Sequence, residues 1–247
     1  EAFVRGNVMA TNNVIAACRE AGVAKLVFTS SPSVVAADHD LRGVDESQPY
    51  PPSFKAFYPE TKAAAERAVL ENHGHSLKTI ALRPHLIFGP GDTNLVPTIL
   101  KRARAGRLVQ VGDGTNLVDL TFIDDCVSAH VLAANVLDER PAAGGRAYFI
   151  SQGSPVRLWQ WIGRVLALHD APPVRRRLSA TTARFLATVA EGAWRTFGLA
   201  SDPPLTRFLA EEMATDHYFD ITAARRDLGY APSCTVWEAT EQTFGRA

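Results

Sequence analysis

The chain has few cysteines, no net charge and no long apolar stretch. Its three cysteines stand far apart without a Cys-x-x-Cys pair, which argues against a disulfide scaffold and indicates reduced thiols in the cytoplasm. Acidic and basic residues number 26 each, so the composition favours neither a nucleic-acid footprint nor a surface strongly attracted to anionic lipid. No apolar run reaches the ~18 residues that a membrane-spanning helix needs. What remains is typical of a soluble α/β enzyme.

The functional interpretation depends most on Tyr58 and Lys62. Three residues separate them, so one helical turn places an ammonium group close to a phenol. A tyrosine alone titrates near pH ~10, whereas a neighbouring cation favours the phenolate and brings its pKa toward the range that proton transfer requires. The spacing therefore predicts an acid or base catalyst.

Ser31 is the next candidate. Residues 25–30 form an apolar, β-branched run that ends in hydroxyl groups, as a buried parallel strand should when it opens into a site. Ligands of open α/β sheets bind outside the carboxyl ends of the strands, where Ser31 could donate a hydrogen bond to a substrate carbonyl. The alternative is a serine-rich turn that caps a helix, which Pro32 and the absence of helical periodicity disfavour.

Hydrophobic periodicity predicts strands that alternate with helices up to residue 151 and mostly helices after it. The predicted strands are 25–30, 78–83, 117–122 and 146–151, with a long loop over 32–56 and a short hairpin around 112–114. The predicted helices are 1–20, 58–73, 94–105, 124–138, 156–169, 179–197, 205–213, 221–228 and 236–246.

Four motifs follow one another: Ser-Ser at 30–31, Tyr-x-x-x-Lys at 58–62, Leu-Arg-Pro at 82–84 and Gly-Pro-Gly-Asp at 89–92. In this order they resemble the extended short-chain dehydrogenase/reductase superfamily, and within it the 3β-hydroxysteroid dehydrogenase branch. Further similarity points to the β-keto acid reductases of bacterial long-chain olefin biosynthesis. It is carried by residues 95–97, 111–114, 148–151 and 203–211, and spans essentially the whole chain.

The resemblance implies an α/β fold with a doubly wound, Rossmann-type parallel sheet and a smaller, mostly helical portion that binds substrate. Residues 1–91 and 123–151 would belong to the dinucleotide-binding domain, and residues 92–122 and 152–247 to the substrate-binding portion. The glycine-rich turn that cradles a dinucleotide pyrophosphate is missing, and residues 1–8 already look like the middle of a helix. We therefore expect either that an N-terminal segment is missing or that the protein is a remnant unable to hold a cofactor.

The catalytic roles that the resemblance implies fall on four residues. Tyr58 would protonate the carbonyl oxygen during reduction, or remove the hydroxyl proton during oxidation. Lys62 would hold the nicotinamide ribose hydroxyls and lower the pKa of Tyr58, and Ser31 would orient the carbonyl. Asn7 matches a fourth catalytic residue that supports a proton relay, although this chain has Ala10 where the family usually has glycine. The alternative for Asn7 is an exposed helix residue.

The implied cofactor is NAD or NADP, since the residue that selects between them would lie in the missing segment. Its expected contacts are Thr29, Ser30, Tyr58, Lys62, Pro84, His85 and Leu86. The backbone after Pro84 should meet the nicotinamide carboxamide, while the His85 side chain should pack or face solvent rather than take part in acid–base chemistry. Related enzymes often pair through helices, so a homodimer is expected by analogy.

Sugar-nucleotide epimerases and dehydratases of the same superfamily use the same catalytic residues and cofactor. Those members carry an arginine that clamps the substrate diphosphate, and this chain has Val118 in its place. A valine cannot form a bidentate bond with phosphate, so this class is the second choice. A third alternative is a protein that senses dinucleotides without turnover.

An apolar substrate fits better, either a 3β-hydroxysteroid or a long-chain 2-alkyl-3-oxo acid. The expected substrate contacts are Ser33, Phe54, Leu120, Phe122, Trp194 and Phe208, with Pro51, Pro52 and Phe57 in the entrance loop. The helix predicted over 179–197 has an apolar side, formed by Phe185, Leu186, Val189, Ala193 and Phe197. Such a side usually packs onto the core, and the alternative is a lid that contacts an acyl chain or a membrane surface.

Other clusters carry little functional signal. The Asp-His-Asp segment at 38–40 and the His-Gly-His segment at 73–75 contain metal-type ligands, but no third group lies at a suggestive spacing, so no metal site is expected. Ser31, His85 and Asp92 could form a hydrolase triad only with a Gly-x-Ser-x-Gly elbow, which the chain lacks.

Overall fold

The computed structural model, which describes residues 2–36, 39–197, 203 and 205–245, is built around a parallel sheet. Its strand order is β1-β3-β8, formed by β1 (Lys25–Thr29), β3 (Lys78–Pro84) and β8 (Ala147–Ile150). The central strand β3 is buried along almost its whole length, because it is covered on both faces. All three strands lie where the sequence predicted them.

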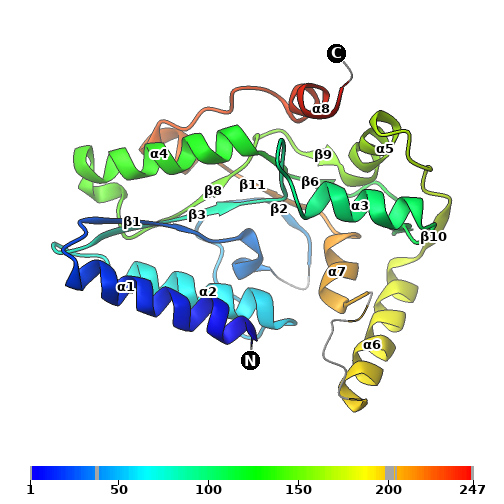
Figure 1. The fold of residues 1–247 in the computed structure, drawn as a ribbon, viewed down its shortest axis with the longest axis horizontal. Helices are drawn as coiled ribbons and strands as arrows, with labels where there is room; N and C mark the ends of the chain where they lie inside the picture. Colours follow the sequence, from blue (N-terminus) through cyan, green and yellow to red (C-terminus); the bar gives the residue numbers. More distant parts are fainter. Residues whose placement is uncertain (1, 37–38, 198–202, 204, 246–247) are drawn as a thin grey trace.

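Helices cover both faces of this sheet (Figure 1). On one face lie α1 (Ala10–Glu20) and α2 (Phe57–Glu71), and on the other lies α4 (Ile123–Glu139). Small side chains on α2, Ala63 and Ala65, are fully buried and let the helix approach the sheet closely. The arrangement is the predicted doubly wound α/β fold.

A second sheet joins segments that lie far apart in the chain. Its order is β2-β11-β6-β9, with β2 (Leu41–Val44), β11 (His217–Phe219), β6 (Leu117–Val118) and β9 (Val156–Arg157). Two further pairs are β4 (Ile87–Phe88) with β7 (Thr121–Phe122) and β5 (Val109–Val111) with β10 (Arg176–Leu178). The predicted hairpin around 112–114 is therefore wrong, because β5 and β6 pair with different partners. The loop predicted over 32–56 contains β2 and a short 3₁₀ helix.

The remaining helices confirm the predicted segments to within a few residues. They are α3 (Leu95–Arg104), α5 (Leu158–Leu168), α6 (Ala180–Thr196), α7 (Arg207–Glu212) and α8 (Val236–Phe244). Shorter helical turns are the π-helical η1 (Val4–Met9) and η4 (Ala224–Leu228) and the 3₁₀ turns η2 (Pro32–Val35) and η3 (Pro141–Ala143). The three cysteines are free, as predicted.

The apolar side of α6 faces away from the core, contrary to the prediction. Phe185 and Phe197 are 66% and 76% exposed, whereas Ala183 and Ala187 on the opposite side are fully buried. Small alanine side chains permit the close approach of α7, and the large residues are left outside. No helix among the described residues is both long and apolar enough to cross a bilayer.

Candidate active site

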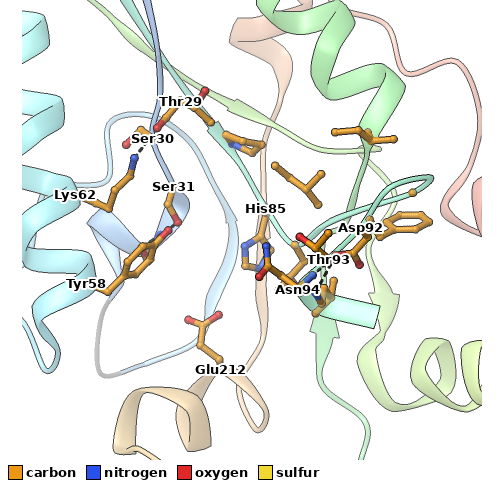
Figure 2. A pocket seen from close by; sticks show the side chains of 18 of the residues that line it. Thr29, Ser30, Ser31, Tyr58, Lys62, His85, Asp92, Thr93, Asn94 and Glu212 are labelled. Atoms are coloured by element: carbon orange, nitrogen blue, oxygen red, sulfur yellow. Dashed lines mark hydrogen bonds between the residues drawn. The ribbon is translucent and has the colours of Figure 1, made fainter. Parts of the chain in front are cut away.

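A cavity of about 720 Å³ opens at the carboxyl ends of β1 and β3, where the sequence predicted a site (Figure 2). Polar groups from β1 and α2 lie on one side of it, and the loop that follows β3 lies on the other. Its lining residues are Thr29–Ser31, Ser33, Tyr58, Lys62, Pro84–Leu95, Ile123, Phe208 and Glu212.

Lys62 is tied to the end of β1. Its ammonium group donates a hydrogen bond of 2.6 Å to the carbonyl oxygen of Thr29 and lies 4.3 Å from the centroid of the Phe28 ring. Burial lowers the pKa of Lys62 below its ordinary value. Because an ammonium group has three N–H donors, two are left for ligand hydroxyls.

Tyr58 and Ser31 face the same cavity from different segments (Figure 2). Tyr58 is 38% exposed, and its ring meets the edge of Phe3 at 6.3 Å between centroids. The Ser31 hydroxyl oxygen accepts hydrogen bonds from the backbone N–H and the hydroxyl of Ser33, at 3.2 and 3.0 Å. Since both are accepted bonds, the hydrogen of Ser31 can be donated to a ligand.

Asn7 contacts α2 and is not among the residues that line the cavity. It belongs to the π-helical turn η1, and its side-chain amide donates a 2.9 Å hydrogen bond to the hydroxyl of Thr61. That hydroxyl in turn donates to the carbonyl oxygen of Phe57 at 2.7 Å. Asn7 is thereby connected to the first turn of α2, which carries Tyr58, and π-helical turns occur often at functional sites.

Two features fix the conformation of the loop after β3: residues with a positive φ and a carboxylate that accepts backbone hydrogen bonds. Gly89 has φ of +146°, and a Cβ there would collide with the side chain of Ile123. Leu86 also adopts a positive φ, of +42°. The Asp92 carboxylate accepts hydrogen bonds from three backbone N–H groups at the start of α3, at 2.7, 3.0 and 2.8 Å. It thus occupies the capping role at this helix terminus and fixes the far wall of the cavity.

The His85 side chain is buried and bonded to a second histidine. Its Nε2 lies 2.6 Å from Nδ1 of His217, whose Nε2 lies 2.7 Å from the backbone carbonyl oxygen of Glu212. A carbonyl only accepts, so His217 carries its hydrogen on Nε2 and His85 donates to it. One imidazole nitrogen each of His85 and His217 and one carboxylate oxygen of Glu212, atoms of the kind that can bind a metal ion, lie within 4.8 Å of one another. Burial, with a smaller contribution from His217, holds the pKa of His85 well below its ordinary value.

This depressed pKa predicts a dependence of stability on pH. Unfolded chains bind a proton at His85 below pH ~6.5, but the folded protein does not, so stability is present above that pH and is lost as pH falls. Below pH ~6, the unfolding free energy of the wild type should fall by about 1.4 kcal/mol per pH unit more steeply than that of a His85→Asn variant. Urea denaturation at several pH values measures both slopes.

The comparison with the variant is needed because the protonation of Asp119 changes the free energy of unfolding in the opposite direction. Burial raises its pKa to about 6, so the folded state binds a proton more readily there and gains stability as pH falls. That contribution is common to both proteins and cancels in the difference. Equal slopes would show that His85 is protonated in the folded protein.

A second cavity of about 540 Å³ adjoins the first and shares Phe208 and Glu212 with it. One side is apolar and is formed by Val35, Ala36, Leu41, Pro49–Pro52, Phe54 and Pro59. The other side carries polar groups of α7 and its surroundings, including Glu211 and Asp216. The two cavities therefore meet at α7, and Ser31, Tyr58 and Lys62 line only the first.

Arg83 and Glu66 form a buried ion pair beneath the site. The guanidinium of Arg83 donates to the two carboxylate oxygens of Glu66 at 3.0 and 2.6 Å, and the Tyr50 hydroxyl donates to the same carboxylate at 2.6 Å. Although burial alone would raise the pKa of Glu66, the bonds from Arg83 hold it below its ordinary value. The pair joins α2, which carries Tyr58 and Lys62, to β3.

The structure brings ten of the predicted site residues together around the first cavity. They are Thr29, Ser30, Ser31, Ser33, Tyr58, Lys62, Pro84, His85, Leu86 and Phe208. Phe54 instead lines the second cavity. Leu120 and Phe122 are buried in the hydrophobic core, because their strand segment packs inward, and half-buried Trp194 on α6 lines neither cavity. Three further residues that the sequence did not point to are Asn94 and Glu212, which line the first cavity, and His217, which lines the second. Asn94 and Glu212 adjoin stretches that carry the family resemblance, which was the one available signal, whereas no motif surrounds His217.

The chain is similar to several known proteins. A sequence model of the 3-beta hydroxysteroid dehydrogenase/isomerase family matches residues 1–176. The chain is 45% identical to the 2-alkyl-3-oxoalkanoate reductase of Stenotrophomonas maltophilia, over 96% of this chain and 73% of that protein. It is 39% identical to the decarboxylating sterol-4-alpha-carboxylate 3-dehydrogenase of Schizosaccharomyces pombe, over 96% of this chain and 70% of that protein.

A similar solved structure is that of MoeE5 in complex with UDP-glucose and NAD. It superposes with a TM-score of 0.70 at 26% identity, over 98% of this chain and 70% of that one.

Proposed function

Because the chain belongs to the 3-beta hydroxysteroid dehydrogenase/isomerase family, we propose that its cavity interconverts a ketone and a secondary alcohol on a long-chain 2-alkyl-3-oxo acid. In class it is a nicotinamide-dependent oxidoreductase that acts on an apolar substrate. The observation that carries the proposal is that Tyr58, Lys62 and Ser31 line one cavity at the carboxyl ends of two parallel strands.

The residues present fit a nicotinamide dinucleotide. Lys62 has donors to spare for ribose hydroxyls, and Pro84, His85 and Leu86 line the cavity. When bound, the cofactor would supply or accept the hydride. Ser31 donates a hydrogen bond to the substrate oxygen and orients it. Tyr58 gives that oxygen its proton during reduction, and the Lys62 cation stabilises the phenolate that is left.

Asn7 has a supporting part in this proposal. Its amide bonds the Thr61 hydroxyl, which is bonded to the backbone of the turn that holds Tyr58. Asn7 would therefore position the first turn of α2. The proposal also includes the two-part division of the chain and a homodimer, for which the short-chain dehydrogenase resemblance is the support. It includes a cytoplasmic location as well, for which the free cysteines are the support.

A sugar nucleotide is the second candidate substrate, since MoeE5 binds UDP-glucose. Val118 is fully buried in the second sheet, so no cation stands at this position to bind a diphosphate. The apolar side of the second cavity, with its prolines and Phe54, suits an alkyl chain better. These two observations favour the oxo acid over the sugar nucleotide.

The test is an assay of ketone-dependent oxidation of NADH and of NADPH by the intact protein. A 2-alkyl-3-oxo acid with two long chains should support turnover. UDP-glucose has no ketone for NADH to reduce, so it is incubated with NAD instead and should give no epimer or dehydration product. A 3β-hydroxysteroid with the oxidised cofactor tests the other apolar substrate. Turnover of the sugar nucleotide alone would overturn the proposal, and so would cofactor binding without turnover of any of the three.

The second cavity predicts a preference for long chains. Ala36 lines it, and Ala36→Phe would displace two or three methylene groups of a bound chain, each contributing about 0.8 kcal/mol. The ratio kcat/KM for a long-chain substrate should therefore fall about 30-fold, while a short-chain analogue should be reduced as before. Ala36→Ser is the matched control and should behave like the wild type. Equal losses for long and short chains would show that the second cavity does not hold the chain.

A further inference from the structure

Three side chains with no part in the proposed reaction meet where the two cavities adjoin. They are His85, which follows β3, Glu212 at the end of α7, and His217 at the start of β11. His85 and Glu212 reach the first cavity (Figure 2), and Glu212 and His217 line the second. No pattern in the sequence indicates such a group, since 132 positions separate the two histidines.

The hydrogen bonds of His217 direct the lone pair of its Nδ1 toward His85. Its Nε2–H donates to the backbone carbonyl oxygen of Glu212 at 2.7 Å, and its Nδ1 lies 2.6 Å from Nε2 of His85. A histidine that binds a metal ion usually donates its other N–H to a carboxylate or a backbone carbonyl, which fixes the tautomer and the orientation of the ring. His217 already has that arrangement, and the two imidazole nitrogens point at one place.

We propose that His85, His217 and Glu212 bind a divalent transition-metal ion of the zinc type, with one coordination position left open to the first cavity. Imidazole nitrogens and a carboxylate oxygen are ligands that Zn²⁺ prefers, and three protein ligands with one open position are typical of zinc sites that substrates can reach. Harder ions such as Mg²⁺ prefer oxygen ligands and water, so they fit this set poorly.

Small movements would bring the three groups to a zinc ion. Two ligand atoms bound to a tetrahedral Zn²⁺ lie about 3.3 Å apart, compared with 2.6 Å between the two ring nitrogens. One carboxylate oxygen of Glu212 lies 3.9 Å from Nε2 of His217, and the Glu212 side chain, which is 25% exposed, has room to turn. The ion would replace the hydrogen between the rings, and His85 would then carry that hydrogen on its Nδ1.

The buried rings also lower the cost of binding an ion. His85 and His217 are 7% and 5% exposed, and the ring of His85 packs edge-on against Phe219 at 5.5 Å between centroids. Ligands that are already held in place lose little conformational entropy when they bind. Glu212 is the one ligand of the three that has to be ordered.

The open position has a consequence for ligands of the first cavity. Glu212 would be the one charged ligand, so the bound Zn²⁺ would keep a net positive charge and attract an anionic oxygen donor. Ser31 and Tyr58 line the same cavity, so a carboxylate next to the reacting ketone could bind the ion. This consequence rests on the proposed function, whose 2-alkyl-3-oxo acid has such a carboxylate, whereas binding of the ion itself does not.

The first test is calorimetric titration of Zn²⁺ into the intact protein after treatment with a chelator. One ion per chain should bind, and Mg²⁺ should not compete with it. Glu212→Gln and His217→Gln should each weaken binding at least about 100-fold, since loss of a group that only orients a ligand already costs roughly 10- to 100-fold. Glutamine in place of His217 keeps a donor for the carbonyl of Glu212 but has no basic nitrogen.

His39→Gln is the matched control. His39 is an exposed histidine that lines the second cavity outside this group, so its loss should leave the affinity for Zn²⁺ unchanged. Circular dichroism checks that each variant is folded, and Glu212→Gln changes only a partly exposed side chain. Absence of Zn²⁺ binding, or an affinity that survives both substitutions, would overturn the proposal. A loss in His39→Gln as large as in the other two variants would place the ion elsewhere and contradict it as well.

Co²⁺ tests the open position, because a four-coordinate Co²⁺ site has strong visible absorption bands that depend on its ligands. The Co²⁺-loaded protein should show these bands, and added acetate should shift them as its carboxylate replaces solvent on the ion. Bands that do not shift would mean that the ion is closed to the cavity, contrary to the proposal. Neither measurement involves turnover, so a failure of the proposed oxidoreductase function would leave both results unchanged.

Discussion

Replacing Tyr58 by phenylalanine should lower kcat/KM for ketone reduction by about 10³-fold, the middle of the range for loss of a general acid. The substitution removes only the hydroxyl, so the ring contact with Phe3 and the position of Lys62 should persist. Binding of NADH or NADPH to the intact protein, followed by fluorescence, should change little, because Lys62 and the backbone after β3 remain. The loss should fall on kcat.

Tyr218→Phe is a suitable control for this experiment. Tyr218 lies on β11 and lines neither cavity, so its hydroxyl should be dispensable for turnover. If Tyr58→Phe keeps more than a tenth of wild-type kcat, another group protonates the substrate oxygen. If it loses cofactor binding as well, Tyr58 holds the nucleotide and its assignment as the proton donor is wrong.

Replacing Arg83 by methionine should destabilise the protein by about 3–5 kcal/mol, because it leaves the Glu66 carboxylate buried without its cation. The Arg83 and Glu66 side chains are only 4% and 0% exposed, so water cannot replace the lost bonds. The methionine retains most of the volume next to Phe149, which limits the cost of a cavity. Urea denaturation measures the difference.

The double variant Arg83→Met with Glu66→Met separates charge from packing. Replacing both partners of a buried ion pair by apolar residues of similar size is often neutral, so the double variant should be clearly more stable than Arg83→Met alone. Arg164→Met serves as a surface control. Its pair with Glu241 is half exposed on both sides and should contribute little to stability. A double variant as unstable as the single one would mean that packing, not an unpaired charge, is responsible.

The sequence predicted the central sheet and the side of the cavity that carries Ser31, Tyr58 and Lys62 for a physical reason. Buried parallel strands leave a continuous apolar run, and residues at their carboxyl ends share one edge of the sheet, so Ser31 could be placed beside Tyr58 and Lys62. What spacing could not show was the partner of Lys62. That partner is the main-chain oxygen of Thr29, and any residue type presents the same carbonyl.

The features that the sequence did not predict depend on contacts between distant segments. β11 has three residues, too few for a periodic pattern, and it brings His217 to His85 across 132 positions. Periodicity showed that α6 has an apolar side but not which side faces inward. The buried side carries Ala183 and Ala187, whose small side chains let the helix lie close to its neighbours.

Gly89 has a consequence for how this enzyme could acquire new substrates. Its positive φ excludes most side chains, and the bulk of Ile123 fills the space that a Cβ would need, so two independent constraints act on one position. A smaller residue in place of Ile123 would leave the unfavourable φ, and a relaxed φ would leave the collision with Ile123, so neither change alone makes room for a side chain at this position. Changes in substrate selectivity during evolution should therefore come from substitutions of the side chains around this loop, while its backbone conformation stays the same.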